Sequence, residues 1–139
     1  MCVRQATLGA CQNLFQPSFK APLETLRDTA ETIKPGCTAA DCPLVNIDTV
    51  HFPTNPKLDA IVERSLLKLT SDGEGAPLPA SLKSYEDSYL QSAQSRNSSY
   101  LQAKVREQHD GLVIIELSSY LDTGGAHGMP GRGFINYSR

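Results

Sequence analysis

Chemically versatile residues gather in one glycine-rich segment near the C-terminal end of the chain. Five of the ten glycines lie between Thr123 and Gly133, together with His127. Glycines at this density allow the backbone to come close to a ligand or to another segment of the protein. A histidine in this setting can bond to the loop that it stabilises, contact a ligand or act in catalysis. We expect His127 to be structural or to contact a ligand.

A hydrolase is the alternative function for this segment. A serine-type hydrolase needs a nucleophilic hydroxyl, a base and an orienting carboxylate within hydrogen-bonding reach of one another. His127 could act as the base and Asp122 as the orienting carboxylate. The nucleophile would then be Ser119 or Thr123. Because residues of these types occur near one another in any polar loop, we expect the domain not to be an enzyme.

A second chemical feature is the pair Cys37 and Cys42, which stand between Gly36 and Pro43. A short, turn-rich spacing of this kind suits a small disulfide, and free thiols are the alternative. A zinc site would need four ligands, of which His51 could supply only the third. We therefore predict a disulfide, and we expect neither a metal nor another cofactor.

The first residues suggest a processing signal. Leu8–Cys11 is similar to the box in which small residues precede a cysteine that becomes lipidated. We expect residues 1–11 to be the remnant of an export or lipoprotein signal, with the lipid on Cys11, and a free thiol in a tail is the alternative. Residues 12–43 would then form a tether and the cysteine loop, and residues 44–139 the folded domain.

The charge balance restricts the partners. Among the 139 residues, 13 are basic and 15 acidic, which gives a net charge of −2 without a dense basic cluster. Nucleic acid, which attracts positive charge, is therefore not an expected partner. The longest apolar run, Leu112–Ile115, is far shorter than the ~20 residues that span a bilayer. A membrane would be reached only through a lipid anchor.

The remaining pattern predicts the elements that position the glycine-rich segment. Near-alternating apolar and polar residues between Pro43 and Pro53 indicate a strand. Pro56, directly after Asn55, suits the first position of a helix whose pattern ends at Ser71.

A second helix is predicted from an apolar stripe at helical spacing, with charged residues such as Glu86 on its other faces. The stripe consists of Leu82, Tyr85, Tyr89 and Ala93. Both helices are amphipathic and can cover one face of a sheet.

Two strands are predicted on either side of Asp110-Gly111, a dipeptide typical of hairpin turns. A two-residue loop would set Val105 opposite Glu116 and mix apolar with charged partners. A three-residue loop, with Gly111 at a left-handed bulge position, sorts the two faces. The pairs in that register are Ala103 with Leu117, Val105 with Ile115, Lys104 with Glu116 and Tyr100 with Tyr120.

Phe134–Tyr137 indicates a further short strand. Together the elements predict an α+β fold, an antiparallel sheet with two amphipathic helices packed on one face. The sheet would end at an unpaired edge. We therefore expect the domain to be truncated at its C-terminal end and to associate through that edge.

The segment Tyr120–Gly128, Tyr-Leu-Asp-Thr-Gly-Gly-Ala-His-Gly, followed by Phe134–Tyr137, resembles part of an envelope domain family. That family occurs beside peptidoglycan deacetylase domains, in lysozyme-sensing anti-sigma factors and in free-standing lipoproteins. The resemblance covers about Leu44–Tyr137. The family usually continues beyond the position of Asn136, whereas this chain stops at Arg139, which also suggests a truncated domain.

The resemblance implies a binding or sensing module. The chain has no Asp-Asp pair and no His-x-x-x-His pair, so it lacks the residues for metal-dependent deacetylation. We expect a non-catalytic lipoprotein domain on the periplasmic face of the envelope, which binds or senses a lysozyme-like protein or a component of peptidoglycan. The residues expected to bind the ligand or to build the loop are Tyr120, Thr123, Gly124, Gly125, His127, Gly128, Arg132 and Asn136.

Overall fold

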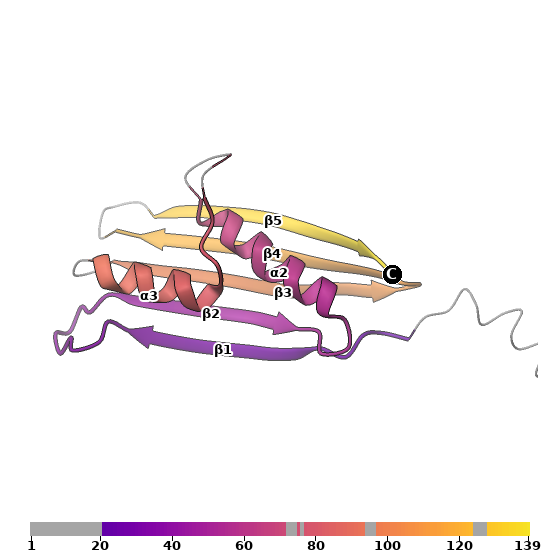
Figure 1. Cartoon of the computed structure of the whole chain (residues 1–139), viewed down its shortest axis with the longest axis horizontal. Helices are drawn as coiled ribbons and strands as arrows, with labels where there is room; N and C mark the ends of the chain where they lie inside the picture. Colours follow the sequence, from indigo (N-terminus) through magenta and orange to yellow (C-terminus); the bar gives the residue numbers. More distant parts are fainter. Residues whose placement is uncertain (1–20, 72–74, 76, 94–96, 124–127) are drawn as a thin grey trace, which may run out of the picture.

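A computed structural model describes residues 21–71, 75, 77–93, 97–123 and 128–139 of the chain. Within these residues, five strands form one sheet in the order β1-β2-β3-β4-β5, and helices α2 and α3 lie on one of its faces (Figure 1). This arrangement confirms the predicted α+β class. No helix in the described part is long and apolar enough to cross a bilayer. The predicted signal remnant and Cys11 lie outside the described residues.

Strand β1 (Leu26–Ile33) is the main addition to the predicted elements. It pairs antiparallel with β2 (Leu44–His51), so that Ala30 lies opposite Ile47. From the sequence, this part of the chain is expected to belong to the tether. Seven of the eight β1 residues are exposed, so the strand has no alternation of apolar and polar residues that would mark it in the sequence.

One strand pair departs from the expected antiparallel sheet. Strand β3 (Ser98–His109) runs parallel to β2, with Leu101 opposite Ile47. Parallel neighbours need a crossover connection. Here the crossover contains α2 (Pro56–Leu69) and α3 (Leu82–Ser92), which is why both helices follow each other on the same face of the sheet.

Helix α2 begins at the predicted position, Pro56, and α3 begins at Leu82, the first residue of its predicted apolar stripe. The side chain of Asn55 accepts a hydrogen bond from the backbone N–H of Leu58 at 3.0 Å, and Ser81 does the same for Ser84. These bonds satisfy donors that the first turn of a helix leaves without partners. Each cap is worth about 1 kcal/mol of stability.

The prediction that Glu86 lies on an outer face of α3 is wrong. Glu86 is only 7% exposed, and it accepts a hydrogen bond from Thr32 Oγ1 at 3.1 Å and an ion-pair contact from Lys83 Nζ at 3.2 Å. Because Thr32 belongs to β1, Glu86 joins α3 to a strand that the helices otherwise leave exposed. The buried carboxylate is a consequence of the undetected strand.

The β3–β4 hairpin has the predicted register but a different turn. Strand β4 (Leu112–Asp122) sets Ile115 opposite Val105, as expected, yet the turn contains only Asp110 and Gly111, whose φ angles are 49° and 81°. A two-residue turn with two positive φ angles matches the twist of a hairpin. The extra residue that the register requires is Arg106, at a bulge in β3. The predicted three-residue loop is therefore wrong.

Strand β5 (Met129–Ser138) is longer than the predicted Phe134–Tyr137 strand and includes the second part of the glycine-rich segment. Gly131 and Gly133 lie beneath the end of α2, where a Cβ at either position would come within about 4 Å of Leu69 Cδ2. Among the described residues β5 pairs only with β4. Association through this edge stays a prediction.

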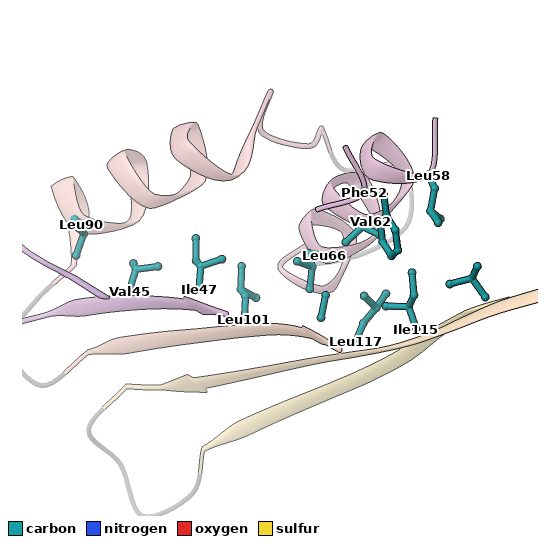
Figure 2. Close-up of a cluster of buried hydrophobic side chains, with 12 residues drawn as sticks. Val45, Ile47, Phe52, Leu58, Val62, Leu66, Leu90, Leu101, Ile115 and Leu117 are labelled. Carbon is teal, nitrogen blue, oxygen red and sulfur yellow. The ribbon is translucent and has the colours of Figure 1, made fainter. Parts of the chain in front are cut away.

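The hydrophobic core lies between the two helices and the sheet (Figure 2). Alternate positions of β2, β3 and β4 point toward the helices, which follows from the pleat of a strand. Side chains with 1% exposure or less include Val45, Phe52, Leu58, Val62, Leu66, Val113 and Ile115. Each such side chain contributes about 1.5–3 kcal/mol by leaving water. The opposite face of the sheet is not covered by α2 or α3.

The sulfur atoms of Cys37 and Cys42 are 2.01 Å apart, which confirms the predicted disulfide. The bridge closes the connection from β1 to β2, next to a backbone hydrogen bond from Lys34 N–H to the carbonyl of Pro43. It therefore restrains the strand that has the least apolar burial.

We expect the double variant Cys37→Ser/Cys42→Ser to be less stable than the native protein by about 2 kcal/mol, because a short closed loop restricts the unfolded chain modestly. Urea unfolding measures the difference, and a reductant should lower the stability of the native protein but not of the double variant. Reactive thiols at Cys37 and Cys42 in the unfolded, non-reduced protein would contradict the bridge.

Candidate functional site

The helix-free face of the sheet carries two adjacent rows of side chains that cross the strands. They face away from the helices because they alternate with buried residues such as Leu101 and Leu117. The strand register defines the first row as Thr29, Asp48, Gln102, Ser118 and Arg132. It defines the second row as Glu31, Asn46, Tyr100, Tyr120 and Pro130.

A cleft of about 640 Å³ lies along these rows, and we call it the tyrosine cleft. The side chains of the two rows that line it are Asn46, Asp48, Tyr100, Gln102, Ser118, Tyr120, Pro130 and Arg132. Tyr100 and Tyr120 are 40% and 42% exposed, with ring centroids 6.3 Å apart and ring planes tilted by 54°. Exposed rings among polar groups in a concave surface are typical of ligand sites.

Asp48 organises one end of the tyrosine cleft. Its carboxylate accepts two hydrogen bonds from Arg27, each 2.9 Å long, one from Thr29 at 3.0 Å and one from Gln102 Nε2 at 3.1 Å. The hydrogen bonds from Arg27 are the largest cause that lowers the pKa of Asp48 to about 2. The carboxylate is therefore ionised at neutral pH, and it fixes the orientation of the Gln102 amide.

Glu116 organises the other end. It is largely buried, with 11% of its side chain exposed, and it accepts contacts from Arg132 Nη1 at 2.8 Å and from Arg106 Nε at 2.5 Å. Arg106 is the bulge residue of β3, so the bulge directs a second guanidinium to this carboxylate. The pairing holds Arg132 at the rim of the tyrosine cleft.

Gly128 determines the space for the Tyr120 ring. A Cβ built at Gly128 would lie 2.0 Å from both Cζ and Oη of Tyr120, so a side chain at this position would force the ring to move. The tyrosine ring therefore occupies the volume that any other residue at position 128 would need. This contact assigns a role to one glycine of the glycine-rich segment.

The predicted site residues divide into three groups. Tyr120 and Arg132 line the tyrosine cleft, and Gly128 contacts the Tyr120 ring. Thr123 and Asn136 do not line the cleft. Thr123 is exposed directly after β4, and Asn136 lies opposite Ile114 in β5. Gly124, Gly125 and His127 lie outside the described residues.

Six of the row side chains that line the cleft are not among the site residues predicted from the sequence: Asn46, Asp48, Tyr100, Gln102, Ser118 and Pro130. Polar residues at alternate positions of β2, β3 and β4 are the signal that could have found Asn46, Asp48, Gln102 and Ser118, because they mark the strand face that avoids the core. The predicted hairpin sets Tyr100 opposite Tyr120. The sequence does not show that β2 lies beside β3, so it does not connect this pair with Asn46 and Asp48.

Of the residues in the hydrolase alternative, Ser119 and Asp122 lie on opposite faces of β4. Ser119 lies on the helix-covered face, where a Cβ at Gly131 would be 2.4 Å from its Oγ. Asp122 is three positions further along β4, and strand alternation places it on the opposite face. His127, the proposed base, lies outside the described residues.

The other two histidines end strands β2 and β3. His51 Nε2 lies 2.9 Å from Asp28 Oδ2, and its Nδ1 lies 3.2 Å from Asp59 Oδ1. The contact with Asp28 is the main cause that raises the pKa of His51. His51 thereby joins β1, β2 and α2 in an ion-pair cluster outside the tyrosine cleft. His109 contacts Glu107 at 2.5 Å.

Comparison with solved structures gives two informative neighbours. A DUF3298 family protein from Pseudomonas aeruginosa PAO1 is 67% identical over 86% of this chain, with a TM-score of 0.80. A member of the same family from Bacteroides fragilis matches 86% of the chain with a TM-score of 0.54, and its 16% identity shows the fold alone. The chain spans about half of each neighbour, 53% and 56%. No family model and no curated protein matches the chain.

We expect Gly128→Ala to destabilise the domain because the new methyl group displaces the Tyr120 ring. A double-mutant cycle measures this: the cost should shrink in a Tyr120→Ala background, with a coupling of about 0.5–3 kcal/mol. Gly133→Ala is the matched control, since a Cβ there meets side chains only at 3.9 Å. Additive costs for Gly128→Ala and Tyr120→Ala in urea unfolding would show that the two residues do not touch.

The raised pKa of His51 predicts a pH-dependent contribution to stability. A histidine with a raised pKa in the folded state stabilises fully below its unfolded pKa of about 6.5, and this contribution is lost as the pH rises through the folded pKa. The stability lost in His51→Asn should therefore be larger at pH 5.5 than at pH 8.5 in urea unfolding. Asp28→Asn should reduce this pH dependence, and an equal loss at both pH values would contradict the cluster.

Proposed function

We propose that this DUF3298-type domain is a non-catalytic binding module of the cell envelope, and that its ligand is a lysozyme-like protein or a component of peptidoglycan. The similarity to the Pseudomonas protein supports the domain type. The tyrosine cleft is the observation that carries the proposed binding role.

The tyrosine cleft suits recognition because its polar side chains are already held in place. Asp48 is bonded to Arg27, Thr29 and Gln102, and Arg132 is paired with Glu116. Side chains that are ordered before binding lose less conformational entropy when a ligand arrives. The exposed tyrosine rings add apolar surface that a ligand would cover.

The proposed location rests on the cysteines. The disulfide between Cys37 and Cys42 agrees with an oxidising compartment such as the periplasm. We propose that Cys11 carries a lipid, and that the residues between it and β1 connect the anchor to the folded domain. In this arrangement the domain stands at the periplasmic face of the envelope.

The function is tested by sedimentation of the purified domain with insoluble peptidoglycan and by biosensor binding to immobilised lysozyme. We expect saturable binding to one of these ligands, and we expect Tyr100→Ala/Tyr120→Ala to weaken it by at least about tenfold. Phe134→Ala is the matched control, because Phe134 is 57% exposed on the same sheet face but does not line the cleft. Absence of binding to both ligands would refute the proposed function.

A further inference from the structure

We infer that the tyrosine cleft binds an uncharged oligosaccharide whose sugar rings stack on Tyr100 and Tyr120. This inference rests on the proposed binding function and names the ligand class of the same site. Three properties of the cleft carry it: the exposed rings, the chemistry of the neighbouring polar groups and the balance of charge.

The two tyrosine rings provide a surface for planar, weakly apolar faces. They lie on neighbouring strands, directly opposite each other, and each is exposed by about two fifths. The C–H groups on one face of a pyranose ring are apolar, and they pack favourably on the negative face of an aromatic ring. The Tyr120 ring occupies the space that a side chain at position 128 would take, which Gly128 leaves open.

The polar groups beside the rings are mostly neutral amides and a hydroxyl. Asn46 lies opposite Tyr100, in the same row as the tyrosine pair. Gln102 and Ser118 lie opposite each other in the neighbouring row. Amide and hydroxyl side chains both donate and accept hydrogen bonds. Sugar hydroxyls do the same, so these residues match a saccharide more closely than an ionic ligand.

Charge within the tyrosine cleft is balanced. Asp48 and Arg132 are the charged lining residues, and they have opposite signs. Each has a close counter-ion outside the lining, since Arg27 pairs with Asp48 and Glu116 pairs with Arg132. A single-stranded nucleic acid would also stack on tyrosines, but it needs a positively charged groove to follow its backbone. The balance therefore favours a neutral glycan over a polyanion.

The size of the cleft fits a short stretch of such a chain. Its volume of about 640 Å³ lies within the range of about 300–1,000 Å³ found for small-ligand sites. The cleft crosses β2 to β5, so a linear oligosaccharide would lie across the strands, along the two rows of side chains. Its hydroxyls would then face Asn46 and Gln102, while its rings cover the tyrosines.

Isothermal titration of the oxidised chain with tetra-N-acetylchitotetraose and with cellotetraose tests the inference. We expect saturable binding to at least one of these neutral probes and none to a heparin tetrasaccharide. Because the chain has no tryptophan and five tyrosines, tyrosine fluorescence gives a second readout. Tyr100→Ala and Tyr120→Ala should each weaken binding by about tenfold or more, as expected for the loss of a stacking platform.

Tyr120→Phe should retain most of the affinity because it keeps the ring, and Phe134→Ala should bind like the native chain. Circular dichroism and urea unfolding establish that each variant is folded. Failure of both neutral probes, or equal affinity in folded Tyr100→Ala/Tyr120→Ala, would overturn the inference. If the native chain still sedimented with peptidoglycan or bound lysozyme, the proposed function would stand without it. Tighter binding of the heparin fragment would also overturn the neutral ligand class.

Discussion

Burial of one sheet face beneath α2 and α3 is the interaction on which the rest of this structure depends. The crossover between β2 and β3 contains both helices, so the described helices cover one side of the sheet only. Successive side chains of a strand point to opposite faces. Once Leu101 and Leu117 are buried under the helices, Tyr100 and Tyr120 must point the other way. The tyrosine cleft is thus the outer counterpart of the core.

The outer face is ordered by ion pairs and hydrogen bonds instead of apolar packing. Asp48 connects three strands through bonds to Arg27 and Gln102, and Glu116 binds two arginines from strands on either side of it. Ion pairs at exposed sites contribute little individually, typically about 0–1 kcal/mol. Their larger effect here is to fix the directions of the side chains around the tyrosine rings.

Glycines within β5 and directly before it contribute to packing on both faces of the sheet. Gly131 leaves room for the Ser119 hydroxyl on the helix-covered face, whereas Gly128 leaves room for the Tyr120 ring. The same local composition therefore supports core packing on one side and the cleft on the other. Part of the glycine-rich segment is therefore a strand, in which the absence of a side chain leaves room for neighbouring residues.

The sequence by itself determined the elements with strong local signals. Pro56 after Asn55 indicated the start of α2, and the sorting of Val105 with Ile115 indicated the hairpin register. The spacing of Cys37 and Cys42 predicted their disulfide. Each of these features depends on residues that are close in the chain or related by a simple period.

Only the tertiary structure decided what lies beside these elements. Strand β1 has no apolar pattern, because an exposed edge strand needs none. Its pairing with β2 places Thr32 next to Glu86, which is buried, and Arg27 next to Asp48, with which it forms an ion pair. The parallel contact of β2 with β3 brought Asn46 and Asp48 next to Tyr100 and Gln102, across about fifty residues of sequence. The bulge at Arg106 likewise depended on the whole sheet, since the tight turn and the buried register could coexist only with an extra residue between them.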